Sequence, residues 1–217
     1  MEGFLFDTHV HTAESSFCGV LGAEETVRLY RDAGFSGICV TDHYCPTYGH
    51  QKLKDILKGY HRAAQCGREL GVDVLLGIEL RLRGSLNDYL LFGVTEDFLR
   101  AYPRLCEYTM AEMSALMRAN DVLVFQAHPF RTMCQAASPQ YLDGVEAVNG
   151  NPRHNSRNGM AADYARAHGL YASAGSDCHQ LEDAGRNGII TTERIRNLDM
   201  LKEALKSPET RLYAMEG

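Results

Sequence analysis

The sequence predicts an α/β fold and, within that class, a small, irregular, TIM-like β/α barrel. Seven short apolar runs lie along the chain, and helix-like stretches separate most of them. Strands that alternate with helices pair in parallel through right-handed crossovers. Histidines and acids follow several of the runs, and in a β/α barrel such residues meet at the C-terminal rim. The alternative fold is an open, doubly wound sheet.

The predicted elements follow one another regularly. The expected strands are residues 3–7, 37–41, 72–80, 89–94, 122–127, 145–148 and 170–174. The segment between Leu80 and Tyr89 is too short for a helix, so we expect the third and fourth strands to form a hairpin-like irregularity. The expected helices are residues 23–33, 53–70, 107–120, 160–168 and 198–205.

Glycines and a threonine mark several helix ends. Gly71 and Gly169 each directly follow a helical pattern, where a left-handed C-cap glycine is common. Thr192 is expected to cap a first turn ahead of the last helix. No repeat or linker-like composition interrupts the chain, so we expect a single domain over residues 1–217.

Composition narrows the class of protein. The 22 basic and 28 acidic residues give a formal charge of −6, which argues against an electrostatic nucleic-acid or membrane partner. No apolar run reaches the roughly 20 residues that span a bilayer, and the N-terminus does not resemble a signal peptide. The seven scattered cysteines resemble reduced thiols. We therefore expect a cytoplasmic protein.

Chemistry-bearing residues gather where the predicted strands end. They are His9, His11, His43, Glu79, His128, Asp177 and His179. Any one of them alone is most often a packed, capping or solvated residue. Five histidines and two acids at the same topological position instead favour a site for several Zn, Mn or Fe ions. Among the other histidines, His61 and His168 are expected on the surface, and the roles of His50 and His154 are left open.

Five motifs in this order are similar to those of the PHP family, named for polymerase and histidinol phosphatase. They are "DTHVHT", "TDH", "GIEL", "AHPFR" and "AGSDCH", and the resemblance runs from Asp7 to about Gly188. It implies a distorted (β/α)7 barrel, which agrees with the seven expected strands. It also implies a site of two or three divalent metal ions that hydrolyses phosphoesters.

The resemblance also assigns roles to individual residues. His9, His11, Glu79 and Asp177 match the ligands of a first metal ion. Glu79 matches the bridge to a second ion, where His128 corresponds to the histidine of the "HP" motif. His43 and His179 match ligands of a third ion.

This sequence departs from the family pattern at two places. The third ion normally takes another ligand shortly after the His-x-His pair, but "AESSFCG" offers only Cys18, which is either a soft thiolate ligand or a small buried residue in a turn. Many relatives supply the second ion with a histidine near the fourth strand, but "SLNDYLLFGVTEDF" contains none. Water, substrate, His50 or His154 could fill that position, or the second ion binds more weakly.

Other polar residues near the strand ends suit a phosphate-binding rim. Arg131, three residues after His128, has a planar guanidinium that matches phosphate oxygens. Weaker candidates for substrate contacts are Arg153, His154, Arg157 and Arg186. Asp7 and Asp42 flank the ligand histidines and are expected to orient imidazoles without binding metal.

These features together predict a metal-dependent phosphoesterase that acts on a small phosphorylated molecule, a nucleotide or an oligonucleotide end. A hydroxide held between two ions bridged by Glu79 would attack phosphorus. The first alternative is a related amide or ester hydrolase, but the carboxylated lysine that would mark it is absent from the strand ends. The second is a metal-binding module without catalytic activity. Retention of nearly all ligand positions argues against this module, because buried, unpaired acids and histidines are costly.

Overall fold

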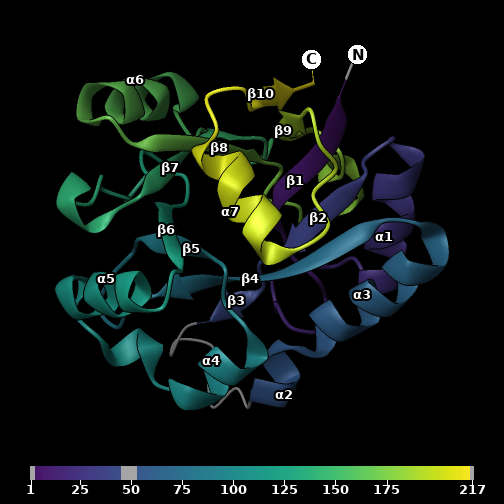
Figure 1. Ribbon diagram of the computed structural model, residues 1–217, viewed down its shortest axis with the longest axis horizontal. Helices are drawn as coiled ribbons and strands as arrows, with labels where there is room; N and C mark the ends of the chain where they lie inside the picture. The colour runs from purple at the N-terminus through teal and green to yellow at the C-terminus, as the bar shows by residue number, and fades with distance from the viewer. Residues whose placement is uncertain (1–2, 45–52, 216–217) are drawn as a thin grey trace.

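One mixed β-sheet, curled into a nearly closed barrel, organises the chain (Figure 1). The computed structural model describes residues 3–44 and 53–215. The strands are β1 (Phe4–Val10), β2 (Gly37–Val40), β3 (His43–Tyr44), β4 (Asp73–Arg81), β5 (Asp88–Phe92), β6 (Leu123–Gln126), β7 (Gly144–Asn149), β8 (Tyr171–Gly175), β9 (Asn187–Thr191) and β10 (Arg211–Ala214). Neighbouring strands follow the order β10-β9-β1-β2-β4-β5-β6-β7-β8, and β3 pairs with β4.

The helices connect these strands, and all but the last lie around the outside of the sheet (Figure 1). They are α1 (Ala23–Asp32), α2 (Leu53–Ile56), α3 (Lys58–Leu70), α4 (Glu96–Ala101), α5 (Met110–Ala119), α6 (Asn158–His168) and α7 (Leu198–Lys206). None of the helices in the described parts of the chain has the length and apolar character needed to cross a membrane.

The seven expected strands are confirmed as β1, β2 and β4 to β8, and the barrel, not the open sheet, is the observed fold. The left-handed caps Gly71 (φ 74°) and Gly169 (φ 63°) are also confirmed. The cap at Thr192 is wrong, because the side chain of Asn197 accepts the bond from the Met200 backbone N–H at the start of α7. Sequence reasoning also missed β3, β9, β10 and α4.

The neighbour of β1 on the side of β8 differs between the two ends of β1. Near the N-terminus of β1, β9 takes the position beside it by antiparallel pairing, as at Phe6 and Ile189. At its other end, β1 meets the segment after β8 directly, since Val10 bridges Cys178. Gly175 permits this approach, because a Cβ there would lie 2.4 Å from the Cβ of His9. The C-terminal ends of β1 and β8 therefore converge.

The expected irregularity between the third and fourth strands is an antiparallel β4–β5 hairpin, in which Arg81 pairs with Asp88 and Gly77 with Phe92. β5 is also antiparallel to β6. It therefore runs against the parallel strands and brings its first residue, Asp88, to the rim where they end.

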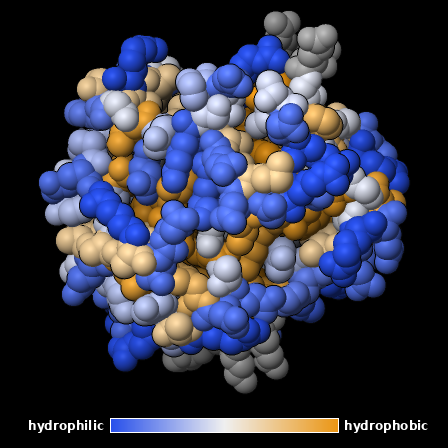
Figure 2. Space-filling model, viewed as in Figure 1, coloured by the Kyte–Doolittle hydropathy of each residue, from blue (hydrophilic) through white to orange (hydrophobic). Residues whose placement is uncertain are grey.

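Helix α7 covers the opposite opening of the barrel and lies in front of the strands in Figure 1. Its buried residues Leu201 and Leu205 belong to the same apolar cluster as Phe6, Phe92 and Phe125 inside the sheet. Figure 2 shows this face, where hydrophilic residues predominate and hydrophobic ones are visible between them near the middle. The barrel interior between α7 and the rim where the parallel strands end is therefore apolar.

Candidate metal centre

A cavity of about 290 Å³ opens at the rim where the parallel strands end. Several strands and the loops that follow them contribute its walls. The lining residues are Cys18, His43, Glu79, Arg81, Asp88, His128, Arg131, Asn151, Arg153, His154, Asp177, His179 and Gln180. His9 and His11 lie beneath them and are fully buried.

The backbone at two of these positions is in the left-handed region. His128 has φ 30° and Asp177 has φ 51°. Histidine and aspartate tolerate this region better than most residues, but it still costs free energy and tends to occur at functional sites. Each residue comes two positions after the end of its strand, β6 or β8, and both side chains line the cavity at the barrel mouth.

Four residues from β1 and the position after it, from β4 and from the turn after β8 form the tightest group. Nε2 of His9 lies 3.0 Å from Nε2 of His11. Oδ1 of Asp177 is 3.4 and 3.5 Å from these two nitrogens. The Glu79 carboxylate is 3.5 Å from His9 through Oε1 and 3.4 Å from His11 through Oε2.

These separations test whether the residues fit a metal ion. Two atoms bound about 2.1 Å from one ion lie roughly 3.0 Å apart in octahedral geometry and about 3.4 Å apart in tetrahedral geometry. The distances between His9 and His11, and from each of these histidines to Glu79 and to Asp177, cover this range. The four residues assigned to the first metal ion by the family resemblance therefore fit one ion together.

Glu79 lies in the middle of the centre and is 1% exposed. Its Oε1 is 3.2 Å from Nε2 of His128, and its Oε2 is 2.8 Å from Nδ1 of His43. Burial raises the pKa of this carboxyl, but the charges of His43 and His9 outweigh burial and hold the pKa well below its usual range. Glu79 is thus a buried anion that faces histidines on both sides, as a bridging ligand would.

A second group surrounds the imidazole of His11. One ligand atom each from His11, His43 and His179 lies within 4.8 Å of the others. Burial raises the pKa of the Cys18 thiol, but hydrogen bonds to His179 and His43 outweigh it and lower the pKa to about 7. The structure therefore brings Cys18 to the two histidines expected at a third ion and favours its thiolate form.

Sequence reasoning missed Glu146, a fully buried residue in β7. Its Oε1 lies 2.8 Å from Nδ1 of His9, and its Oε2 accepts bonds from the His128 backbone and the Asn149 amide. A carboxylate behind a ligating imidazole fixes the tautomer and orientation of the ring. The signal was a lone glutamate inside the apolar strand "GVEAVN".

Asp7 and Asp42 support the histidines differently from the expectation. Asp7 accepts the backbone N–H of His9, and the acceptor of that imidazole is Glu146. Asp42 accepts a bond from Ser16, whose hydroxyl lies 3.1 Å from Nδ1 of His11. The predicted direct orientation of imidazoles by these acids is therefore corrected to backbone support by Asp7 and indirect support by Asp42.

The arginines expected to contact substrate differ in their placement. Arg131 reaches the cavity and binds Asp177, and its Nη2 is 3.4 Å from Oδ1 of Asn149. Arg153 also lines the cavity, but both of its terminal nitrogens donate to buried Asp183 at 2.7 and 2.6 Å. Arg131 is thus the best placed of these cations, whereas Arg153 also holds the loop after β8.

The remaining candidates lie farther out. His154 lines the cavity, while Arg157 is exposed and donates to the Phe130 carbonyl. Arg186 and Arg157 are absent from the cavity lining. His61 and His168 are exposed as expected, and His50 lies outside the described residues.

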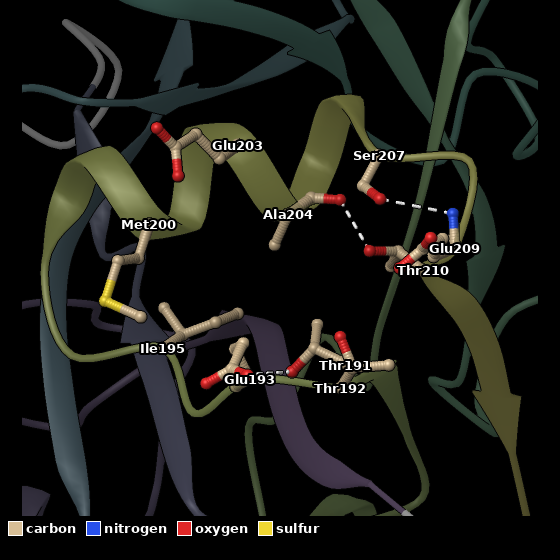
Figure 3. A pocket seen from close by; sticks show the side chains of 10 residues that line it. All are labelled: Thr191, Thr192, Glu193, Ile195, Met200, Glu203, Ala204, Ser207, Glu209 and Thr210. Atoms are coloured by element: carbon tan, nitrogen blue, oxygen red, sulfur yellow. Dashed lines mark hydrogen bonds between the residues drawn. The ribbon is translucent and has the colours of Figure 1, made fainter.

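A different hollow lies beside α7 and β9 (Figure 3). Ile195, Met200 and Ala204 form its apolar part, and its other lining residues are Thr191, Thr192, Glu193, Glu203, Ser207, Glu209 and Thr210. Several polar groups are already bonded within the chain, such as the Thr210 hydroxyl to the Ala204 carbonyl at 2.6 Å. This hollow has none of the histidines of the rim cavity.

A family model described as the PHP domain matches residues 7–206, so this chain belongs to the PHP family. The match confirms the resemblance drawn from the sequence motifs. The comparison with curated proteins gives no match.

Solved structures show the same fold at low identity. A two-domain protein from Bacteroides vulgatus, containing a predicted PHP-like metal-dependent phosphoesterase, is 19% identical with a TM-score of 0.72; the match covers 98% of this chain and 65% of that one. PsfC from Pseudomonas syringae is 16% identical (TM-score 0.69, 99% and 93% covered). An amidohydrolase from Chromobacterium violaceum, whose structure holds sulfate and no metal, is 16% identical (TM-score 0.58, 92% and 96% covered).

Proposed function

We propose that this chain is a metal-dependent phosphoesterase that acts on a small phosphorylated molecule, a nucleotide or an oligonucleotide end. The observation that carries the proposal is the pair His9 and His11 with Glu79 and Asp177 around it: the two histidines lie 3.0 Å from each other and 3.4 to 3.5 Å from each carboxylate, which suits one metal ion. The groups around Glu79 and around His11 offer places for one or two more ions. Zn, Mn and Fe all suit this mixture of imidazoles and carboxylates.

Such ions, when bound, activate a water molecule as the nucleophile and neutralise charge on phosphoryl oxygens. The chain itself supplies rigid support for the ligands, through Glu146 behind His9 and Ser16 behind His11. Arg131 supplies a cation at the cavity wall, where it can contact a phosphate next to Asp177. Because its guanidinium is planar, it can bind two phosphate oxygens at once.

An amide or ester hydrolase is the second candidate, and the amidohydrolase from Chromobacterium violaceum is the observation in its favour. That structure contains sulfate, a tetrahedral anion shaped like phosphate, which agrees equally well with phosphoester chemistry on this fold. Among the described residues that line the rim cavity, none is a lysine that could be carboxylated to hold two ions. The phosphoesterase proposal therefore accounts for more of the site.

Metal analysis and a substrate screen test the proposal. The purified protein should contain at least one transition metal ion per chain. It should hydrolyse p-nitrophenyl phosphate or bis-p-nitrophenyl phosphate with added Mn, Zn or Fe, and chelation should abolish the activity. Hydrolysis of p-nitrophenyl acetate or an anilide, with neither phosphoester cleaved under any metal, would instead support the second candidate.

A further inference from the structure

The fourth strand, which contributes no histidine, brings a carboxylate to the centre. β5 runs antiparallel to its neighbours, so its first residue reaches the rim that receives the last residues of the parallel strands. That residue is Asp88, which lines the rim cavity and is 2% exposed. An acid buried this deeply at a polar rim needs partners for both oxygens.

One partner is Arg81, its cross-strand neighbour on β4. Nε of Arg81 donates to Oδ1 of Asp88 at 2.7 Å, and Nη2 donates to Oδ2 at 2.5 Å. A carboxylate has about four acceptor positions, so two N–H bonds leave one free on each oxygen. Carboxylates that bind metal are themselves commonly held by such outer hydrogen bonds.

The Asp88 carboxylate lies close to two residues of the metal centre. A carboxylate oxygen of Asp88 lies within 4.8 Å of a ligand atom of Glu79 and of one of His43. Its backbone carbonyl accepts the N–H of Ala127, so the pairing of the two strands brings the backbone of Asp88 to the residue before His128. Asp88, Glu79 and His128 all line the same cavity.

We propose that Asp88 is a ligand of the second metal ion, together with Glu79 and His128, and that it replaces the histidine that many relatives supply. The inference rests on the proposed metal centre and adds a ligand to it. Two carboxylates and one imidazole make this position rich in oxygen, whereas the third position holds Cys18, His43 and His179. The second position should therefore prefer Mn²⁺ or Fe²⁺, and the third should accept softer ions such as Zn²⁺.

A structural ion pair between Asp88 and Arg81 is the competing explanation, and the chain contains a control for it. Asp73, at the other end of β4, accepts a bond from Nε of Arg194 at 2.5 Å, far from the metal centre. If Asp88 only neutralises Arg81, then Asp88→Asn and Asp73→Asn should both leave metal binding intact. If Asp88 is a ligand, only Asp88→Asn should change it.

The experiment measures Mn²⁺ bound per chain, by equilibrium dialysis and elemental analysis, in the wild type and four variants. Asp88→Asn should bind one ion fewer, or bind it on the order of 100-fold more weakly, since even outer partners of ligands contribute about 10- to 100-fold. Asp88→His, which restores an imidazole, should recover the lost ion and shift its preference toward Zn²⁺. Asp73→Asn should match the wild type.

Full Mn²⁺ content and wild-type affinity in Asp88→Asn would overturn the inference and leave the metal centre standing, provided His9→Ala loses metal in the same assay. A wild-type protein that binds no transition metal would overturn the proposed function as well. If Asp88→Asn does not fold, as judged by circular dichroism, the metal content of Asp88→His tests the ligand role. Loss of one ion in that folded variant would contradict the ligand role, because the imidazole offers a ligand but cannot replace the ion pair.

Discussion

Glu146 shows how a single residue behind the centre can control it. The carboxylate receives the Nδ1 side of His9, which leaves Nε2 of that ring facing His11 and Asp177. Without this partner, the imidazole could rotate or adopt the other tautomer. The geometry of the first ligand set therefore depends on a strand, β7, that provides none of its four ligands.

Glu146→Gln should weaken metal binding about 10- to 100-fold, because the neutral amide is a poorer acceptor for the His9 ring. Competition with a fluorescent chelator measures the change. Glu203→Gln, at an exposed position on α7, is the matched control. Equal affinities for all three proteins would show that Glu146 has a purely structural role.

Glu79 is the residue on which the proposed two-ion arrangement would depend most, since histidines face both of its oxygens. Glu79→Gln should lower both metal content and the rate of p-nitrophenyl phosphate hydrolysis, while circular dichroism shows an intact fold. The physical reason is that the substitution removes one negative charge from two ions at once. A variant with full metal content and the wild-type rate would contradict a bridging role.

Arg131 tests substrate binding separately from metal binding. Arg131→Ala should leave metal content unchanged and mainly raise KM, by the equivalent of about 1.5–3 kcal/mol for a hydrogen bond to a charged group. Arg131→Lys should recover part of this, because a lysine cannot make two parallel bonds. Unchanged steady-state kinetics in Arg131→Ala would assign the residue to support of Asp177 alone.

At the scale of elements, the first turn of α3 packs unusually closely against the β1 end of the centre. A Cβ at Gly59 would lie 1.8 Å from Oγ1 of Thr12 and 2.8 Å from Oδ2 of Asp42. The same glycine donates its N–H to the Ser15 hydroxyl at 2.9 Å. The helix can approach the polar network of Asp42 only because this position has no side chain.

Gly59→Ala should therefore destabilise the protein by about 1–3 kcal/mol, the usual cost of overpacking. Gly159→Ala in α6 is the control, since a Cβ there meets nothing within 4 Å and should be neutral or stabilise by about 0.5–1 kcal/mol. Urea unfolding of the two variants measures both values. Equal stability would mean that α3 moves away from the rim at little cost.

For the whole molecule, metal binding and proton binding compete at the same side chains. Burial lowers the pKa of His128, but hydrogen bonds to Cys134 and Glu79 outweigh it and raise the pKa to about 9. The unfolded chain has the ordinary histidine pKa of about 6.5. In the metal-free protein, this group therefore contributes stability that is complete below about pH 6.5 and is lost as pH rises towards 9.

A bound ion requires the unprotonated imidazole, so its stabilising effect should increase over the same pH range. We expect the difference in Tm between metal-loaded and chelated protein to grow from pH 6.5 to 9. At an ion concentration of 100 times Kd, the stabilisation is about 2.7 kcal/mol, which corresponds to roughly 5–10 °C for a chain of this size. Thermal unfolding at several pH values measures this difference in Tm. His128→Asn should flatten the dependence, and a constant difference in the wild type would contradict the competition.

The sequence by itself predicted the barrel, because regular alternation of apolar strands and helices leaves few ways to bury all of them. It also indicated His9, His11, Glu79, His128 and Asp177, because the ends of parallel strands share one rim. These are consequences of order along the chain. They require no knowledge of which strands lie opposite one another.

Only the tertiary structure decided the rest. Strand pairing placed the Asp88 carboxylate close to His43, and the long-range approach of β7 to β1 placed Glu146 behind His9. Asp183 drew Arg153 into an ion pair, although the sequence suggested a contact with substrate. Each of these contacts joins residues that are distant in sequence, and burial and charge determine the partners once the strands have paired. Such contacts leave no periodic pattern in the sequence.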